Sequence, residues 1–185
     1  MTSPARPTLV VVSGPPGSGK TTLAHRLAWA IGCPAICRDE IKEGLVHRDP
    51  EFGPGRDDEL SRAANQVFFT VLATLLRAGV TTVAEAAFQQ RLWRPGLEPL
   101  RPLARIRIVH CTVDPGVALQ RSLRRRSQDP NRRAHADPTA AGAADFLERL
   151  RTFDRVDLGT LSAEIDTTNG GQPPLADLLA FIDQP

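Results

Sequence analysis

The 185-residue sequence has no long apolar run. No segment approaches the roughly 20 consecutive apolar residues that a membrane-spanning helix needs, and residues 1–7 lack the apolar core of a signal peptide. Hydrophobic residues make up 41% and charged residues 24% of the chain, as in ordinary globular proteins. We therefore expect a cytoplasmic protein of one domain over residues 1–185, with a core that needs no disulfides or metals.

Cysteine is scarce. Cys33, Cys37 and Cys111 are odd in number and too widely spaced to indicate a disulfide framework. Cys33 and Cys37 would supply half of a metal site, but no second pair of cysteine or histidine residues follows at ligand spacing. The pattern favours three buried free thiols.

Lysine occurs at only two positions, since 21 of the 23 basic residues are arginine. The guanine-binding motif N-K-x-D requires asparagine before lysine, and neither Lys20 nor Lys42 follows one, which excludes switch GTPases. No expected strand ends in the Asp-Glu pair typical of oligomeric ATP-driven motors, because the third one is followed by Glu85 alone. Tyrosine is absent and aromatic residues make up 5%, which disfavours a surface that stacks nucleic-acid bases.

Strand and helix patterns alternate along the chain. Strands are expected at residues 8–13, 35–37, 80–84, 106–112 and 161–165. Helices are expected at residues 20–31, over a long segment ending at Gly79, after Asp114-Pro115, after Asp137-Pro138, and at residues 174–182. The apolar face of the long helix comprises Leu60, Ala64, Val67, Phe68, Val71 and Leu75. This order predicts an α/β fold with a five-stranded parallel sheet covered by helices on both faces. Ligands of such sheets bind at the carboxyl ends of the strands.

The first expected strand leads into VVVSGPPGSGKTT, residues 10–22. The sequence matches G-x-x-x-x-G-K-[ST] between a strand and a helix, the context of a phosphate-binding P-loop, and predicts a three-layer P-loop NTPase sandwich. Backbone N–H groups and the helix N-terminus would bind ATP phosphates, with Lys20 on the β- and γ-phosphates and Thr21 on Mg²⁺. The expected ATP-binding residues here are Gly14, Pro15, Pro16, Gly17, Ser18, Gly19, Lys20, Thr21 and Thr22.

The segment ICRDEIK, residues 36–42, directly follows the second expected strand. Asp39 would therefore lie at the carboxyl edge of the sheet, beside the terminal phosphate. An ionised carboxylate there can accept the proton of a hydroxyl group that attacks phosphorus. Asp39 can also cap a helix that starts at Glu40, and both roles are compatible. Glu40 and Glu43 are expected to be solvated helix residues.

An arginine-rich segment, RSLRRRSQDPNRR, occupies residues 121–133 and contains one acid, Asp129. Such a run is usually a solvated face. Here it follows the fourth strand and a capped helix and is interrupted at Asp129-Pro130, which favours a lid over about residues 121–137 that excludes water. Arg121 and Arg125 lie on one helix face, so that one can stack on adenine while the other reaches phosphate. Arg125 and Lys20 are the expected catalytic cations.

Taken together, the segments GPPGSGKTT, RDEIK, VAEAAF and DTTNG and the arginine-rich lid resemble a P-loop small-kinase family. This family contains chloramphenicol phosphotransferase, zeta toxins and the kinase domain of polynucleotide 5′-hydroxyl kinases. The resemblance implies that Asp39 activates the acceptor hydroxyl and that Thr168 and Asn169 contact adenine. Many relatives have Asp where this chain has Glu85, so a magnesium-binding, acceptor-binding or structural role is open for Glu85.

Acceptors in this fold usually dock between the second and third strands, here about residues 39–79. From Asp39 to Arg62 there are eight acids and four bases, a balance of −4. A polynucleotide requires a basic groove, so nucleic acid is disfavoured, as is an anionic nucleoside monophosphate. The charge balance favours a neutral or cationic small molecule with a hydroxyl group, such as an antibiotic or amino sugar.

Three aromatic residues near this segment either line the acceptor pocket or pack in the core: Phe68, Phe69 and Trp93. His47 and His135 lie near enough to the acceptor segment and the lid to contact a ligand, whereas His25 and His110 are expected to be structural. Two rivals to a small-molecule kinase stay open, a polynucleotide 5′-hydroxyl kinase and a regulatory module that binds ATP without turnover. The sequence does not predict the oligomeric state.

Overall fold

The computed structural model describes residues 6–49, 51–52, 59–135 and 137–184. Arg56, Asp57 and Asp58, three of the charges counted above, lie outside these residues, as do the side chains of Asn131 and Arg133. The described strands form one parallel sheet in the order β2-β3-β1-β4-β5. They are β1 (Thr8–Ser13), β2 (Ala35–Cys37), β3 (Thr82–Glu85), β4 (Arg105–Thr112) and β5 (Ser162–Asp166).

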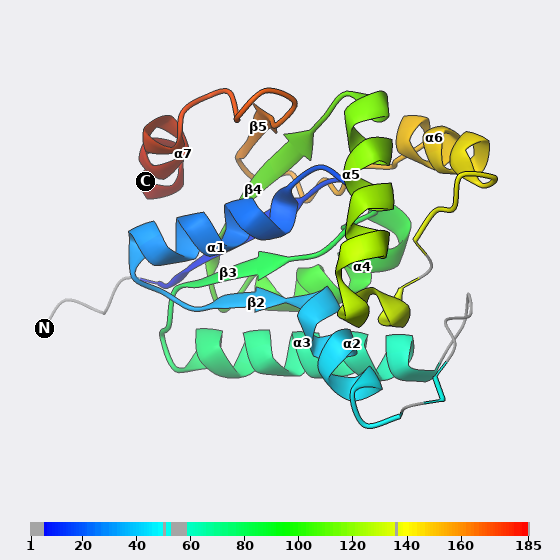
Figure 1. The fold of residues 1–185 in the computed structure, drawn as a ribbon. Helices are drawn as coiled ribbons and strands as arrows, with labels where there is room; N and C mark the ends of the chain where they lie inside the picture. Colours follow the sequence, from blue (N-terminus) through cyan, green and yellow to red (C-terminus); the bar gives the residue numbers. More distant parts are fainter. Residues whose placement is uncertain (1–5, 50, 53–58, 136, 185) are drawn as a thin grey trace, which may run out of the picture.

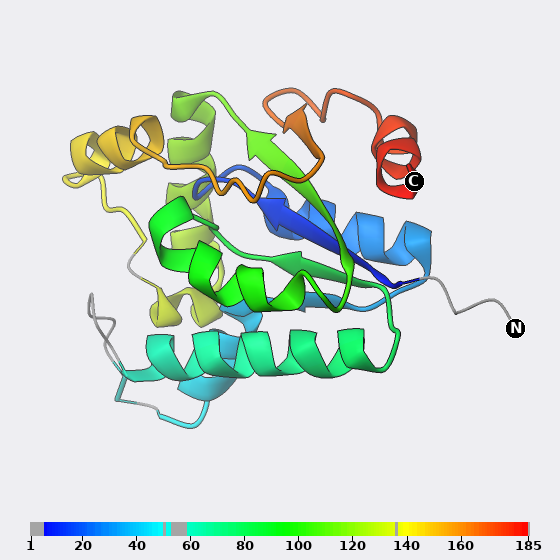
Figure 2. The same cartoon turned by 180° about the vertical axis from the view of Figure 1, so that it is seen from behind.

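Helices cover both faces of the sheet (Figures 1 and 2). On one face lie α1 (Lys20–Ile31) and α7 (Leu175–Asp183), and on the other α3 (Glu59–Arg77) and α4 (Gln90–Leu97). The central strand β1 is buried on both sides, because Val10 and Val12 face α1 while Leu9 and Val11 face α3. The predicted fold class, a three-layer α/β sandwich of the P-loop type, is confirmed.

Four of the remaining elements gather at the carboxyl ends of the strands: α2 (Arg38–Val46), α5 (Pro115–Gln128), η2 (Pro130–Ala134) and α6 (Ala143–Arg151). The short helix η1 (Glu98–Leu100) instead leads from α4 into the start of β4. The N-terminus of α5 is capped as predicted, since the side chain of Asp114 accepts a hydrogen bond from the N–H of Val117 at 3.0 Å. A helix does follow Asp137-Pro138, but its predicted cap is wrong: the Asp137 carboxylate accepts a hydrogen bond from Arg132, and α6 begins only at Ala143.

The third strand begins two residues later than predicted. Gly79 adopts a left-handed φ of 79°, and the N–H of Val80 bonds to the carbonyl oxygen of Leu75 at 2.9 Å. Val80 therefore belongs to the turn that ends α3, and the strand extends to Glu85. The carboxyl group that the sequence placed after this strand is consequently its last, fully buried residue.

The buried face of α3 is rotated from the predicted one. Ala64 and Phe68 are buried as expected, and Leu72 and Leu76 continue this face. Val67, predicted on the buried face, is 41% exposed. The helix is apolar on more than one side, so its hydrophobic pattern alone does not define its orientation.

The aromatic residues pack in the core beneath α3 and α4. Phe68, Phe69 and Trp93 join Phe88 in one cluster, with the Phe88 and Trp93 ring centroids 4.9 Å apart. The core-packing interpretation of these residues is thus the correct one. The helix α4 that carries Trp93 was not predicted.

All three cysteines are free thiols, as predicted, although Cys33 is only partly buried. Among the helices that the structure describes, none is both long and apolar enough to cross a bilayer.

Candidate active site

A tight loop at residues 14–19 joins the end of β1 to the start of α1. Gly17 and Gly19 have φ angles of 82° and 72°, a conformation that glycine adopts without strain. A Cβ atom at Gly17 would lie only 2.5 Å from the carbonyl oxygen of Ala118 in α5, so a side chain is also excluded by packing. The strand, loop and helix predicted around the glycine motif are thus present.

Lys20 and Thr21, in the first turn of α1, both contact the buried carboxylate of Glu85. The Lys20 Nζ lies 3.8 Å from Glu85 Oε1, and the Thr21 hydroxyl donates to Oε2 at 3.2 Å. Burial raises the pKa of Glu85; Lys20 lowers it and Asp39 raises it again, so that the pKa lies above the usual range of a glutamate. Glu85 is therefore held in place by Lys20 and Thr21, the two residues of the glycine motif whose side chains are expected to contact phosphate and Mg²⁺.

Asp39 lies in the first turn of α2, which begins at Arg38 with Cys37 as its N-cap residue. The interpretation of Asp39 as the cap of a helix starting at Glu40 is therefore wrong. Its carboxylate accepts a hydrogen bond from Arg38 Nη1 at 3.1 Å, and its side chain is two-fifths exposed. Burial raises the pKa of Asp39, but His135, Lys20 and Arg38 lower it further than burial raises it, so the group is ionised at neutral pH.

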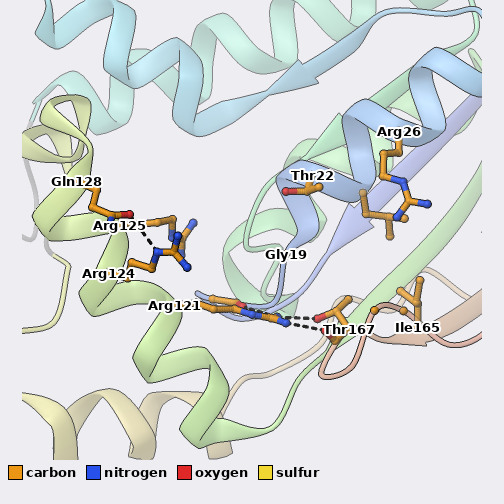
Figure 3. Close-up of a pocket in the computed structure, with 13 residues that line it drawn as sticks. Gly19, Thr22, Arg26, Arg121, Arg124, Arg125, Gln128, Ile165 and Thr167 are labelled. Atoms are coloured by element: carbon orange, nitrogen blue, oxygen red, sulfur yellow. Dashed lines mark hydrogen bonds between the residues drawn. The ribbon is translucent and has the colours of Figure 1, made fainter.

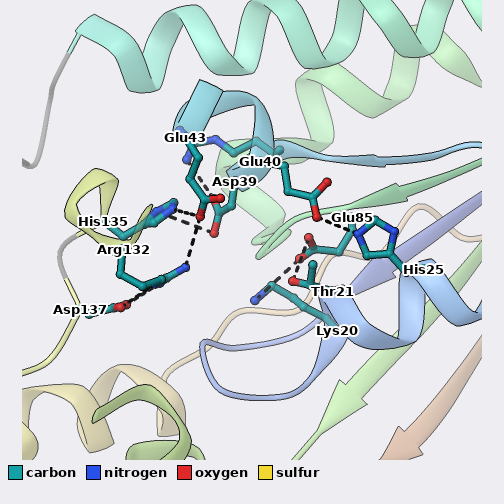
Figure 4. Close-up of polar contacts among 11 residues, drawn as sticks. Lys20, Thr21, His25, Asp39, Glu40, Glu43, Glu85, Arg132, His135 and Asp137 are labelled. Carbon is teal, nitrogen blue, oxygen red and sulfur yellow. Dashed lines mark hydrogen bonds and ion pairs between the residues drawn. The ribbon is translucent and has the colours of Figure 1, made fainter. Parts of the chain in front are cut away.

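A second polar network joins α2 to η2 across the site (Figure 4). His135 Nε2 lies 2.8 Å from Glu43 Oε1, and its Nδ1 lies 3.9 Å from Asp39 Oδ2. Arg132 makes a bidentate pair with Asp137 and lies 3.7 Å from Glu43. Glu43 is therefore not the solvated residue that the sequence predicted. The sequence did contain a signal that Glu43 faces the site, because residues four apart on a helix, such as Asp39 and Glu43, share one face.

Arg121 connects three segments of the chain. Its guanidinium donates to the carbonyl oxygens of Gly17 at 3.4 Å, Thr167 at 2.8 Å and Thr168 at 3.2 Å. It thereby ties α5 to the glycine loop and to the loop after β5 (Figure 3). The Thr168 hydroxyl in turn accepts a hydrogen bond from the N–H of Asp114 at 2.8 Å.

Two adjoining cavities meet at the glycine loop. The first, of about 430 Å³, is lined by Gly17, Gly19, Thr22, Leu23, Arg26, Arg121, Arg124, Arg125, Gln128, Ile165, Thr167, Gly170 and Gly171. The second, of about 410 Å³, is lined by Pro16, Lys20, Thr21, Thr22, Asp39, Glu40, Glu43, Ala87, Arg125, Asp129, Arg132, His135 and Asp137. Thr22 and Arg125 line both, so the two cavities adjoin at these residues.

Not every predicted ligand-binding residue reaches these cavities. The loop after β5 lines the first cavity through Thr167 and two glycines, while Thr168 is engaged by Arg121 and Asp114 and Asn169 is exposed. His47 is exposed at the end of α2. Asp39, Lys20 and Arg125 line one cavity, as their predicted roles require.

Arg125, which lines both cavities, has a buried Nε without a hydrogen-bond partner within the described part of the chain. Buried polar atoms are nearly always satisfied, so an atom like this fits a site that binds a polar ligand. Thr21 and Glu85 offer the adjacent oxygen atoms that Mg²⁺ prefers. The residues present therefore fit a nucleotide with its magnesium ion.

Known proteins share this architecture. The model of the AAA domain family matches residues 9–155. A structure from Chloroflexus aurantiacus J-10-fl, provisionally named a kinase, aligns with a TM-score of 0.84 at 23% identity, covering 96% of this chain and 97% of that one. A gluconokinase from Sinorhizobium meliloti 1021 aligns with a TM-score of 0.60 at 19% identity, covering 96% and 90%.

A chain of the Pnkp1/Rnl/Hen1 RNA repair complex aligns with a TM-score of 0.58 at 16% identity, covering 81% of this chain and 47% of that one. At these identities the structural likeness concerns the fold. The family model, in contrast, spans most of the sequence and includes the glycine loop, Asp39, Glu85 and the arginine-rich helix. The chain therefore belongs to the AAA domain family, and its fold is that of the P-loop small kinases.

Proposed function

We propose that this protein is an ATP-dependent phosphotransferase that moves the γ-phosphate of ATP to a hydroxyl group of a small molecule. One observation carries the proposal: the 410 Å³ cavity joins Lys20 and Thr21 of the glycine loop to Asp39 of α2 and Arg125 of α5. A phosphate-binding loop, a carboxylate and an arginine in one cavity are the parts that phosphoryl transfer requires. The kinase names of the structural neighbours agree with this chemistry.

In this proposal the nucleotide occupies both cavities. The base lies in the 430 Å³ cavity against Arg121, and the phosphates follow the loop toward the junction at Thr22 and Arg125. The contacts of the nucleotide include residues 14–22, Arg121 and Arg125, with Thr168 and Asn169 positioning the loop beside the base. Helix α1 directs its N-terminal N–H groups at the phosphates.

Thr21 and Glu85 are the residues that would hold Mg²⁺. Bound there, the ion would neutralise charge on the β- and γ-phosphates. Lys20 Nζ lies 3.8 Å from Glu85 Oε1 and would contact the phosphate oxygens of bound ATP. Arg125 would supply its unpaired Nε–H to the transferring phosphoryl group.

Asp39 acts as the general base. The carboxylate is ionised, exposed to the cavity and oriented by Arg38, so it can accept the hydroxyl proton as the oxygen bonds to phosphorus. The lid, about residues 121–137, would exclude water, held over the cavity by the contacts of His135 and Arg132 with Glu43. In our proposal the glycine loop, the general base and the lid all belong to a single domain.

The acceptor is a neutral or cationic small molecule. Five acids line the 410 Å³ cavity, namely Asp39, Glu40, Glu43, Asp129 and Asp137, against Lys20, Arg125, Arg132 and His135. Because Lys20 and Arg125 are assigned to the phosphates, the acceptor would meet a surface in which acids predominate. An antibiotic or amino sugar with a hydroxyl group suits both this charge and the volume.

A polynucleotide 5′-hydroxyl kinase is the second candidate, favoured by the likeness to a chain of an RNA repair complex. Its binding should weaken steeply with salt. A regulatory module that binds ATP without turnover is a third candidate.

The test is to incubate the protein with γ-labelled ATP, Mg²⁺ and a panel of amino sugars, aminoglycosides, neutral sugars and 5′-hydroxyl oligonucleotides. Label in a small molecule supports our proposal; label in an oligonucleotide supports the second, and tight ATP binding without transfer or hydrolysis supports the third.

A further inference from the structure

A cluster of three unlike side chains lies beside the proposed active site, and only Glu40 among them was used above, as one of the acids that line the 410 Å³ cavity. His25 comes from α1, Cys37 from the end of β2 and Glu40 from the first turn of α2. His25 Nε2 lies 2.7 Å from Glu40 Oε1 and 3.7 Å from Cys37 Sγ, and all three ligand atoms lie within 4.8 Å of one another. Figure 4 shows His25 and Glu40 facing each other across the gap between α1 and α2.

We propose that His25, Cys37 and Glu40 bind a zinc ion. Imidazole, thiolate and carboxylate are the three side-chain ligands that Zn²⁺ takes in proteins, at about 2.0–2.3 Å in tetrahedral geometry. Those bond lengths place the sulfur and nitrogen ligands about 3.6 Å apart, which is close to the 3.7 Å between Cys37 Sγ and His25 Nε2. On binding, the Cys37 thiol proton passes to solvent and its sulfur lone pair bonds to the metal.

The Glu40 carboxylate must move to complete the site, because its oxygen, within 4.8 Å of Cys37 Sγ, has to come to about 3.6 Å from that sulfur. The 2.7 Å between His25 Nε2 and Glu40 Oε1 is a hydrogen bond, and zinc would open it by about 0.7 Å to reach tetrahedral spacing. Both side chains are half exposed, at 50% and 49%, so the adjustment does not require the core to move. Cys37 is buried, so the metal would lie at the boundary between core and solvent, with its fourth position open to water.

The plain alternative is a surface ion pair between His25 and Glu40, with Cys37 merely nearby. Such a pair needs no sulfur ligand, whereas zinc bound at this cluster requires one. The sequence discouraged a metal site because Cys33 and Cys37 lack a second pair at ligand spacing. The structure pairs Cys37 instead with residues from two other elements.

The site would connect the two helices that carry the proposed chemistry, because α1 begins with Lys20 and α2 contains Asp39. The Cys37 thiol also lies near the buried carboxylate of Glu85, whose charge adds to the burial that raises the pKa of this thiol. Zinc at the cluster would put a divalent cation near that carboxylate. Occupancy is thus expected to alter phosphoryl transfer as well as stability, and the proposal does not depend on which acceptor is used.

The test titrates metal-free full-length protein with Co²⁺, and then with Zn²⁺, in the absence of nucleotide. We expect one equivalent of Co²⁺ to give a thiolate-to-cobalt charge-transfer absorption that Zn²⁺ abolishes. Thr21 and Glu85 offer only oxygen ligands, so cobalt bound there cannot produce this band. Cys37→Ser should lose the band, whereas the matched control Cys33→Ser should keep it.

His25→Gln provides a second test that leaves the core intact, because its side chain is half exposed. It should weaken Zn²⁺ affinity about tenfold or more in competition with a chromogenic chelator, and Glu40→Gln should do likewise. Zinc should raise the melting temperature of the wild type and of Cys33→Ser but not of His25→Gln. The proposal is overturned if cobalt binds without a thiolate band, or if His25→Gln binds zinc as tightly as the wild type. Should Cys37→Ser fail to fold, these two results decide alone.

Discussion

Replacing Asp39 with asparagine removes the proposed general base with almost no change in shape. The amide oxygen of asparagine can still accept the hydrogen bond that Arg38 Nη1 donates to Asp39 Oδ1 at 3.1 Å, so the side chain should keep its orientation. What it loses is the negative charge and the ability to take a proton. Because α2 is capped at Cys37 and not at Asp39, the helix should not lose a capping interaction.

General base catalysis contributes roughly 10²–10⁴ in rate, equivalent to about 3–5 kcal/mol of transition-state stabilisation. We expect kcat of Asp39→Asn to fall by this factor. The KM for ATP should stay the same or decrease, since the substitution removes an ionised carboxylate from a cavity that would receive phosphates. Loss of rate without loss of nucleotide affinity is the signature of a residue that acts in the transition state.

The assay follows transfer of label from γ-labelled ATP to the acceptor that the panel identifies, with ATP affinity measured separately by calorimetry. Asp177→Asn is the matched control, because Asp177 also lies in the first turn of a helix but is exposed on α7. It should behave as the wild type. Transfer by Asp39→Asn within tenfold of the wild-type rate, with a folded protein, would refute the base assignment.

Three further results are expected. Arg125→Met should lower kcat by on the order of 10³. The melting temperature of the nucleotide-free protein should stay the same or rise, because the buried Arg125 Nε has no partner among the described residues. The exposed control Arg149→Met should change neither quantity. Gly17→Ala should cost about 2 kcal/mol or more of unfolding free energy in urea, since its φ is 82° and the new Cβ would lie 2.5 Å from the Ala118 carbonyl oxygen; a value under 0.5 kcal/mol would contradict the packing argument. Burial lowers the pKa of His110 below its value in the unfolded chain, so the unfolded state takes up the proton first as the pH falls. The free energy of unfolding should therefore decrease between about pH 7 and about pH 5. His110→Phe should flatten this pH dependence, and an unchanged pH dependence in the variant would exclude His110 as its source.

Local patterns were sufficient to predict most of the framework. Each strand except β3 was predicted to within about one residue. For β1 and β4 the reason is a run of apolar β-branched residues bounded by turns, which identifies a buried strand independently of the rest of the fold. The start of α5 followed from Asp114 and Pro115, whose effects on the helix N-terminus reach only three residues along the chain. The same reasoning failed at Asp137-Pro138, where a contact with Arg132 takes the carboxylate that would have capped a helix.

The sequence by itself determined the glycine loop and the position of Asp39 at the end of β2, since a motif with four specified residues and its flanking strand and helix are local. Only the tertiary structure decided which side chains meet around that loop. Glu43 and His135 are 92 positions apart, and Thr21 and Glu85 are 64 apart. Such contacts depend on how helices pack on the sheet and on where each strand ends, which no periodicity within one element encodes. The grouping of His25, Cys37 and Glu40 arises in the same way, from three elements whose ends converge only after the chain has folded.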